Sequence, residues 1–415
     1  MNLSRTSLRH QELIWLILCV ALGLTLRFSA IGTFSHMPES DELNYHSMAL
    51  NLISGNGIVD ALGNHAFFNV GYPLFVLAPV FAIFGDDLLI VQLLNALLGG
   101  LAIVLCYVTA KEAGAGKIGR LLATALWAGY LPASVYTVYL FKENLMAPLM
   151  LGVIWCAIRL AKEPTYITAV GCGVLFGLIA LTGNAALSLA APVALALVVT
   201  SAKPRRKLVL FMSIVITALF VAAPWMVRNM HVLGSPLLNT NGGFNLYIGN
   251  NPAATGVFVS ISDTPRGDTW RDLRAKGEVL ASETLKGEAI AWIKENPTAF
   301  TVLALKKAVL FWTPPFHQGE GQASRAESIV RVLWLIQFIV LLAGALASAF
   351  IKGLWRCPIA VLWLAIAGYT AAHMLFYVIF RYREPIMPQV CILAAMTFEF
   401  LLNRWKIRSN RSYAV

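Results

Sequence analysis

The stretch LIWLILCVALGLTLRFSAI (residues 13–31) is long enough and apolar enough to cross a lipid bilayer as one helix. Arg5, Arg9 and His10 precede it, as basic residues precede the apolar part of a signal peptide. The stretch is long, however, and has no clear cleavage site of small residues. We therefore expect it to be retained as a first membrane helix.

Comparable apolar runs recur along the 415-residue chain, in which 58% of residues are hydrophobic. The mean hydropathy of +0.70 is well above that of water-soluble globular proteins. We therefore predict an all-α polytopic membrane protein with about ten transmembrane helices. The expected spans are residues 13–31, 88–110, 121–140, 144–161, 165–182, 184–200, 208–227, 327–350, 358–380 and 385–402.

The net charge of +11 comes from short basic clusters that lie between the apolar runs. This distribution is typical of membrane orientation by Lys and Arg, and it does not indicate nucleic-acid binding. Cytoplasmic N- and C-termini place every one of these clusters on the inner side. They are residues 111–120, 159–162, 203–207, 352–356 and 404–411.

Two apolar segments, residues 72–84 and 299–312, are too short to be obvious spans. If either crossed the bilayer, the basic loops that follow it would fall outside, against the orientation rule. We therefore expect both to be juxtamembrane helices on the outer face. Two outer regions follow, residues 32–87 and 228–326, within a single membrane domain of residues 1–415.

The first outer region carries three carboxylates within four residues, at Glu39, Asp41 and Glu42. Ser40 is expected to cap a short amphipathic helix, with Asp41 and Glu42 in its first turn. Capping accounts for one acid better than for three. A solvated helix cap and a functional acidic group both remain open for this segment.

A second acid, Glu143, lies beside Lys142 at the outer junction between two predicted spans. It would face the same compartment as Asp41. The alternative is a Lys-Glu pair that extends to the membrane surface.

Basic residues also occur on the side that the orientation rule disfavours, at Arg228, Arg381 and Arg383. Guanidinium groups bind phosphate through a planar fork, so these arginines indicate a phospholipid-like substrate. Pairing with lipid headgroups or with Glu384 is the alternative. The pair Lys306-Lys307, within the apolar segment 299–312, is expected to bind lipid headgroups or the same anion, and Lys306 is the candidate for the donor phosphate.

The motifs together resemble the GT-C superfamily of membrane glycosyltransferases. They are most similar to the family 39 group, which includes protein O-mannosyltransferases and the aminoarabinose transferases that act on lipid A. The matching pieces are Ser40-Asp41-Glu42-x-x-Tyr45 with Ala49 and Gly55-x-Gly57, Gly71-Tyr72-Pro73-Leu74, Glu143-Asn144, Pro224-Trp225-x-x-Arg228-Asn229, Gly249-Asn250-Asn251-Pro252 and Arg381-Tyr382-Arg383-x-Pro385-x-x-Pro388.

This resemblance implies an inverting transfer of a sugar from a polyprenyl phosphate, usually undecaprenyl phosphate in bacteria. The acceptor would be an envelope lipid, glycan or protein at the periplasmic face of the bacterial inner membrane. Asp41 would be the general base, supported by Glu42 and Glu143. The donor phosphate would bind Arg228, Arg381, Arg383, Lys142 and Lys306, and the substrate pocket would include Tyr45, Tyr72, Asn229, Asn250 and Tyr382.

No metal ligands are predicted, because the six cysteines and the histidines show no ligand spacing, and a divalent-metal requirement stays open. Three other functions also stay open. A transporter or flippase of lipid-linked sugar would need polar groups near the bilayer midplane, of which the middle spans carry almost none. A polysaccharide polymerase or ligase would use a lipid diphosphate donor, and a non-catalytic subunit would not need the acids at residues 39–42.

Overall fold

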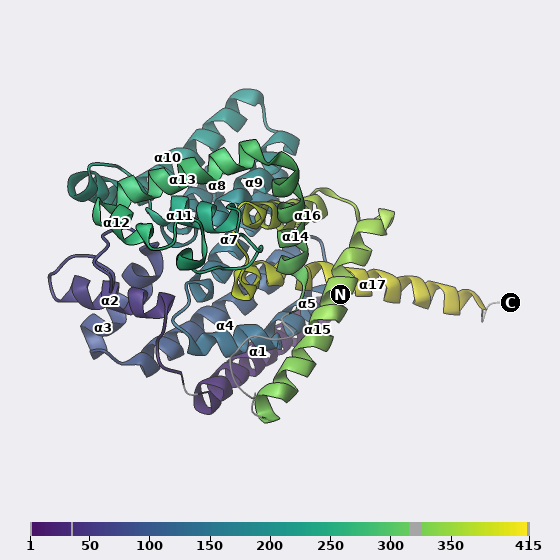
Figure 1. Ribbon diagram of the computed structural model, residues 1–415. Helices are drawn as coiled ribbons and strands as arrows, with labels where there is room; N and C mark the ends of the chain where they lie inside the picture. Colours follow the sequence, from purple (N-terminus) through teal and green to yellow (C-terminus); the bar gives the residue numbers. More distant parts are fainter. Residues whose placement is uncertain (1, 35, 315–324, 413–415) are drawn as a thin grey trace.

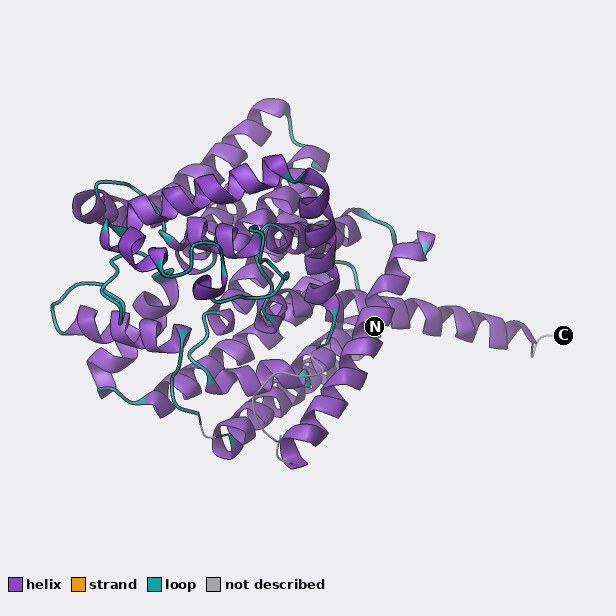
Figure 2. Cartoon of the chain, in the orientation of Figure 1, coloured by secondary structure: helices purple, strands orange, loops and turns teal. Residues whose placement is uncertain are grey.

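The computed structural model describes residues 2–34, 36–314 and 325–412, and the regular secondary structure in these ranges is helical (Figure 1). Helices are joined by turns and short loops (Figure 2). Within these residues the β-structure is one isolated bridge between Val257 and Val378. The predicted all-α fold is therefore confirmed.

Among the described residues, seven helical segments are long and apolar enough to cross a bilayer, and a helix pair bent by 49° makes an eighth if the pair is counted as one span. The protein is thus a multi-pass membrane protein. The seven are His10–Thr33 in α1 (Asn2–Thr33), α4 (Leu88–Glu112), α7 (Glu143–Lys162), α10 (Pro204–Leu233), Ser328–Phe350 in α15 (Arg325–Phe350), α16 (Cys357–Met374) and Phe380–Ile407 in η6 (Phe380–Ile386) and α17 (Met387–Ser412). The bent pair joins α5 (Lys117–Ala128) to α6 (Leu131–Val135) and η2 (Tyr136–Val138).

Two more predicted spans are helices too short to cross by that measure. They are α8 (Tyr166–Thr182) and the pair η3 (Asn184–Leu189) with α9 (Ala190–Val199). All ten predicted positions therefore coincide with helices, whereas seven or eight have the length of a full span. The C-terminal part of α17 extends away from the bundle (Figure 1).

Local sequence explains where several of these helices begin and end. The Asp87 carboxylate accepts from the backbone N–H groups of Leu89 and Ile90 at the start of α4. Pro204 occupies the first position of α10, where a missing N–H costs nothing. Gly234 ends α10 in the left-handed conformation, with φ of 70°.

Helices α8 and α10 pack closely because α8 presents glycines to its neighbour. A Cβ atom at Gly173 would lie 2.6 Å from the Ile214 carbonyl oxygen, and one at Gly177 would lie 2.5 Å from Val221. Small residues at four-residue spacing allow helix backbones to approach in a membrane, where burial from water does not drive association.

The outer regions fold into short helices that lie against the bundle. Residues 32–87 contain α2 (Asp41–Ile53), the π-helical turn η1 (Pro73–Leu77) and α3 (Ala78–Phe84). The described part of 228–326 contains α11 (Asn241–Gly249), η4 (Ile261–Asp263), α12 (Thr269–Ala275), α13 (Glu278–Glu295) and α14 (Pro297–Trp312). The segments predicted as juxtamembrane correspond to η1 with α3 and to α14, and neither has the length and composition of a span.

Ion pairs gather the predicted inner loops at one end of the bundle. Arg120, at the start of α5, pairs with Glu12 of α1 at 2.6 Å. Glu112, at the end of α4, pairs with Lys162 at 3.1 Å and with Arg159 at 3.6 Å. The helix ends that share these loops therefore lie together, as the predicted topology requires.

Hydrogen bonds join the two predicted outer regions to each other. The Glu278 carboxylate accepts from the backbone N–H of His65 at 2.9 Å and of Ala66 at 3.2 Å. It also accepts from the Thr240 hydroxyl at 2.8 Å, and the Thr240 N–H donates to the Ala66 carbonyl. The Glu278 carboxylate thus joins segments that are about 210 residues apart in the sequence.

Replacing Glu278 by Ala is expected to lower the free energy of unfolding by about 2 kcal/mol, because two partly buried N–H groups and a hydroxyl lose their acceptor. Thermal unfolding in detergent measures the change. Glu283→Ala is the matched control, since Glu283 pairs only with exposed Lys286. Equal effects of the two substitutions would contradict the assignment.

Candidate active site

Asp41 begins α2 and is held by an unusual backbone turn. Ser40, just before it, has φ of 51° and ψ of −116°, a conformation that non-glycine residues rarely adopt. Ser40 occupies the predicted N-cap position of α2, but its hydroxyl makes no capping hydrogen bond among the described residues. The Asn44 amide instead binds the Ser40 carbonyl at 2.9 Å and fixes the turn.

Arg381 is the centre of the site. Its Nη2 pairs with Oδ2 of Asp41, and its Nε lies 3.7 Å from Oε1 of Glu143. The guanidinium also lies over the ring of Phe141, 4.3 Å from the ring centroid. Three distant segments, α2, the start of α7 and η6, therefore meet at one cation.

Glu42 is directed away from this cluster and is 1% exposed. Its Oε1 accepts from the Leu140 N–H at 2.7 Å, and its Oε2 contacts Nε2 of His36. These contacts hold the segment before α7 against α2. The arrangement gives Glu42 a supporting position one residue from Asp41.

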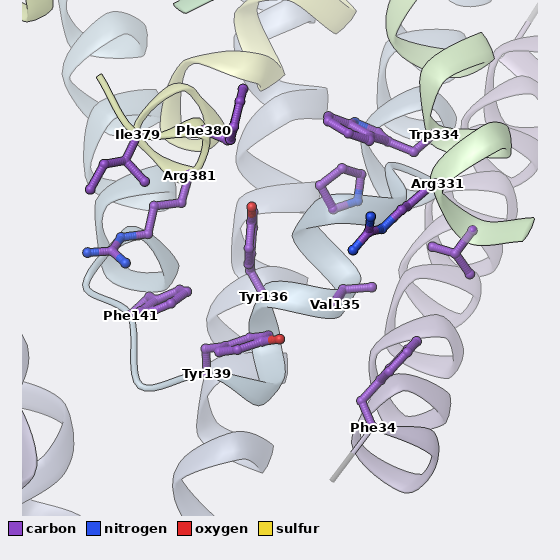
Figure 3. Close-up of a pocket in the computed structure, with 12 residues that line it drawn as sticks. Phe34, Val135, Tyr136, Tyr139, Phe141, Arg331, Trp334, Ile379, Phe380 and Arg381 are labelled. Atoms are coloured by element: carbon purple, nitrogen blue, oxygen red, sulfur yellow. The ribbon is translucent and has the colours of Figure 1, made fainter. Parts of the chain in front are cut away.

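An apolar cavity of about 340 Å³ lies beside Arg381 (Figure 3). Arg381 lies over Phe141 on one side of it, and Arg331 of α15 lies on the other side near Trp334 (Figure 3). The lining comes from α6, η2, α15 and η6 and from loop residues that follow α1, follow η2 or precede η6. The lining residues are Phe34, Pro132, Val135, Tyr136, Tyr139, Phe141, Val330, Arg331, Trp334, Ile379, Phe380 and Arg381.

A second, more polar cavity of about 110 Å³ is lined by Glu143 and Lys142. Burial lowers the pKa of the Lys142 ammonium, and the carboxylates of Glu143 and Asp41 oppose that change. Tyr382 also lines this cavity, as predicted for the substrate pocket. The Arg381 cluster therefore adjoins both cavities.

Amide side chains of the polar cavity escaped the sequence-based prediction. Asn69 donates to Asn184 at 3.0 Å, and Asn239, Asn241 and Asn245 line the same space. The polar break at Asn184 between two apolar runs was the signal that could have identified it. The other amides lie in turn-rich loops, where a structural role is the ordinary interpretation.

Two predicted pocket residues lie behind Asp41 rather than on a cavity wall. Tyr45 is 3% exposed and packs edge-to-face on Tyr72, with ring centroids 6.0 Å apart. The Tyr72 hydroxyl donates to Asn95 of α4 at 3.0 Å. Both tyrosines support α2, and neither lines the two cavities described above.

Arg228 and Asn229 hold outer loops together. Arg228 donates to the carbonyls of Ile58 and His65 and to Oδ1 of Asn229, each at 2.8 Å. Asn229 in turn donates to the Leu237 carbonyl at 2.7 Å. The structure does not bring either residue to Arg381. Their predicted roles at the phosphate and in the pocket have no support from these contacts.

Arg383 is fully buried and ties η6 to the end of α14. Its Nη1 donates to the carbonyls of Phe311 and Thr313, both at 2.9 Å. Its guanidinium lies over Phe338, 4.5 Å from the ring centroid. The arrangement is structural and leaves Arg381 as the arginine of this motif that faces a cavity.

The adjacent lysines of α14 point in opposite directions. Lys306 is exposed, whereas Lys307 is fully buried and donates to Oδ1 of Asn250 at 3.1 Å. Asn250 also donates to the carbonyls of Leu246 and Leu375. Asn250 is therefore a structural link between α11, α14 and the end of α16. The sequence-based choice of Lys306 fell on the solvent-facing member of the pair.

Burial lowers the pKa of Lys307 to about 8 from an ordinary value of 10.5. Below pH 8 both folded and unfolded states carry the proton, and the folded state bears the cost of burying the charge. Between pH 8 and 10.5 the unfolded chain binds more protons than the folded chain, so stability rises with pH. We expect Lys307→Met to remove this rise, measured by thermal unfolding from pH 7 to 10.5.

Lys306→Met is the control, because Lys306 is exposed on the adjacent position of α14. It should keep the pH dependence of the unsubstituted protein. Identical curves for the two variants would show that Lys307 is not buried as described.

In the described ranges, no group of three or more His, Cys, Asp and Glu side chains is arranged to hold an ion. Asp41 and Glu143 instead face the guanidinium of Arg381.

The sequence from residue 72 to residue 227 matches the family described as dolichyl-phosphate-mannose-protein mannosyltransferase. The match covers less than half of the chain. It spans η1 to α10 and includes Glu143, but neither Asp41 nor Arg381. None of the curated proteins is a significant match.

Among solved structures, the archaeal oligosaccharyltransferase AglB from Archaeoglobus fulgidus, in complex with an inhibitory peptide and a dolichol-phosphate, is 14% identical, with a TM-score of 0.56. The alignment covers 98% of this chain and 52% of that one. The same archaeal enzyme tethered to an acceptor peptide gives 16% identity and a TM-score of 0.56, with 96% and 50% coverage. The chain spans about half the length of these structures.

ArnT from Cupriavidus metallidurans, bound to undecaprenyl phosphate, is 16% identical over 92% of this chain and 77% of that one, with a TM-score of 0.43. At these identities the likeness to the archaeal structures concerns the fold, which almost the whole of this chain shares. The predicted resemblance is thereby confirmed: the chain has the fold of the GT-C membrane glycosyltransferases.

Proposed function

We propose that the protein is an inverting glycosyltransferase that moves a sugar from a polyprenyl phosphate to an acceptor at the periplasmic face of a bacterial inner membrane. One observation carries the proposal. Arg381 lines an apolar cavity and at the same time pairs with Asp41 and Glu143. The site therefore offers neighbouring positions for the lipid chain and the phosphate of a donor, next to a pair of protein carboxylates.

The donor fits the apolar cavity by its chemistry. The walls of Tyr136, Phe141, Trp334 and Phe380 suit a prenyl chain, and the lining includes two guanidinium groups, those of Arg331 and Arg381. Dolichol-phosphate is present in one of the AglB structures of the same fold. Undecaprenyl phosphate is the bacterial lipid of the same class and is the donor carrier that we propose.

The reaction is a single displacement at the anomeric carbon. The acceptor oxygen forms a bond to that carbon while the bond between the carbon and the phosphate oxygen breaks. Asp41 takes the acceptor proton, and polyprenyl phosphate leaves with the electron pair. One displacement inverts the anomeric configuration.

The ion pair of Arg381 suits this sequence of events. Without donor, the guanidinium neutralises Asp41. A donor phosphate would compete for that guanidinium and leave the Asp41 carboxylate available as a base. The charge that grows on the leaving phosphate is then stabilised by Arg381, an interaction worth roughly 3 kcal/mol in comparable sites.

The sugar or the acceptor group is proposed to occupy the polar cavity. Its amides and tyrosine hydroxyls can bind several hydroxyl groups, and Glu143 and Lys142 lie at its edge. Glu143 also holds the Nε side of Arg381, so it would keep the guanidinium oriented when Asp41 releases it.

Asp41→Asn is expected to abolish sugar transfer, by a factor of at least about 100, because the amide cannot accept the acceptor proton. Donor binding should remain. Transfer of labelled sugar by purified protein measures the first, and equilibrium binding of the labelled donor measures the second. Glu39→Gln is the control, since Glu39 is exposed and should leave both unchanged. Near-normal turnover of Asp41→Asn would refute the assignment.

Val135→Trp is expected to fill part of the apolar cavity and to weaken donor binding by about tenfold or more. Val199→Trp, at the exposed end of α9, is the matched control. Equal donor affinity in the two variants would mean that the prenyl chain binds elsewhere.

A panel of labelled polyprenyl-phosphate and polyprenyl-diphosphate sugars, incubated with purified protein and membrane extract, separates the remaining functions. Label that moves to an acceptor only from a monophosphate supports the proposal. Transfer only from a diphosphate would assign a polymerase or ligase. Donor that crosses the bilayer in vesicles without transfer would assign a flippase.

A further inference from the structure

Arg27 is a buried cation inside the first membrane helix. It is 1% exposed and lies six residues before the end of α1, about 9 Å along the helix axis. Its Nη1 donates to the Gly23 carbonyl at 2.9 Å. None of the ion pairs among the described residues includes it. Burying an ionisable group within a membrane helix costs free energy, so a buried arginine at this position indicates a functional role.

Helix α4 is shaped to receive this side chain. A Cβ atom at Gly99 would lie 2.1 Å from Nε of Arg27 and 2.8 Å from its Cδ. At the adjacent Gly100, the nearest atom to a Cβ would belong to Leu24 at 3.3 Å. Because Gly99 has no side chain, the guanidinium of Arg27 can occupy the space beside it.

The guanidinium borders a cavity of about 30 Å³ that also contains the candidate catalytic acid Glu143. This volume is sufficient for one or two water molecules. One glycine and three alanines complete the lining with polar side chains from five helical segments, α1, α5, η2, α7 and η6. The lining residues are Arg27, Gly99, Ala102, Trp127, Ala133, Tyr136, Glu143, Asn144, Ala147 and Glu384.

Three buried polar atoms on this lining have no hydrogen-bond partner within the described parts of the chain. They are Nε of Arg27, Nε1 of Trp127 and Oε2 of Glu384. Two of them are donors and one is an acceptor, and Glu143 adds a further carboxylate. A buried water normally makes two to four hydrogen bonds, and the cavity offers donors and acceptors in that number.

We propose that this cavity is a hydration site whose ordered water connects Arg27 to Glu143, and that Arg27 is a positioning residue for the Arg381 cluster. The inference rests on the proposed function for its consequence, but the water site does not depend on it. The guanidinium of Arg27 and the carboxyl groups of Glu143 and Glu384 face one small space. A water molecule that hydrogen-bonds to these groups bridges them, with an enthalpy close to that of a direct hydrogen bond.

The consequence for the site follows from the contacts of Glu143. Its Oε1 lies 3.7 Å from Nε of Arg381, which pairs with Asp41. Arg27 therefore acts on the reaction through Glu143 and the orientation of Arg381, without touching substrate. Loss of Arg27 should lower kcat for transfer and leave the KM for the donor nearly unchanged.

Radical footprinting tests the water site without any activity. Radicals that X-ray radiolysis forms from bound water modify the side chains beside it. Trp127 should be labelled although it is 2% exposed. Trp225 is the internal control, because it is 5% exposed, its Nε1 donates to the Leu238 carbonyl and it does not line the cavity. Labelling of Trp127 no greater than that of Trp225 would overturn the hydration site.

Arg27→Met should reduce Trp127 labelling and lower kcat by about threefold or more, and Arg27→Lys should restore both in part. If Arg27→Met does not fold, Gly99→Ala displaces the guanidinium from its seat and should have the same effects. Gly100→Ala, which meets Leu24, is its matched control. The role of Arg27 is refuted if Gly99→Ala and Gly100→Ala behave alike in both measurements.

The two proposals fail in different ways. Absence of sugar transfer in the unsubstituted protein, with Trp127 labelled as expected, would remove the transferase and leave the hydration site. Normal transfer with unlabelled Trp127 would remove only the hydration site.

Discussion

The arrangement of the candidate site depends on the guanidinium of Arg381. It neutralises Asp41 from the first outer region, approaches Glu143 at the start of α7 and lies on the ring of Phe141. Asp41 and Arg381 are 340 residues apart in the chain. Removing any one of these three groups would leave an unpaired charge in a partly buried position, which is strongly unfavourable.

Around this cation the structure separates two kinds of space. Aromatic side chains of η2, α15, η6 and the loops that follow α1 and η2 line the apolar cavity, and amides and tyrosines line the polar one. The separation matches a substrate with a lipid part and a sugar part. The remaining outer charges serve the scaffold: Arg228 and Glu278 join the two outer regions, and Arg383 anchors η6 to α14.

Hydropathy predicted the positions of all ten apolar helices, because the bilayer imposes one strong constraint on composition and length. Which charges meet was harder to predict. Lys306 and Lys307 differ by one helical position, and only the packing of α14 decides which is buried. Arg228 and Arg381 are similar in sequence context, yet the guanidinium of Arg228 donates hydrogen bonds to backbone carbonyls. Arg27 was missed, although a lone arginine in an apolar span is itself a signal.

In the proposed reaction, Arg381 binds the donor phosphate while Asp41 is released as a base. The most direct measurement is a high-resolution structure of the Asp41→Asn variant with a polyprenyl-phosphate sugar. The account predicts the phosphate on the guanidinium of Arg381, the prenyl chain in the cavity beside Trp334, and the anomeric carbon facing residue 41. A phosphate held at Arg228 or Lys306, with no donor in that cavity, would contradict it.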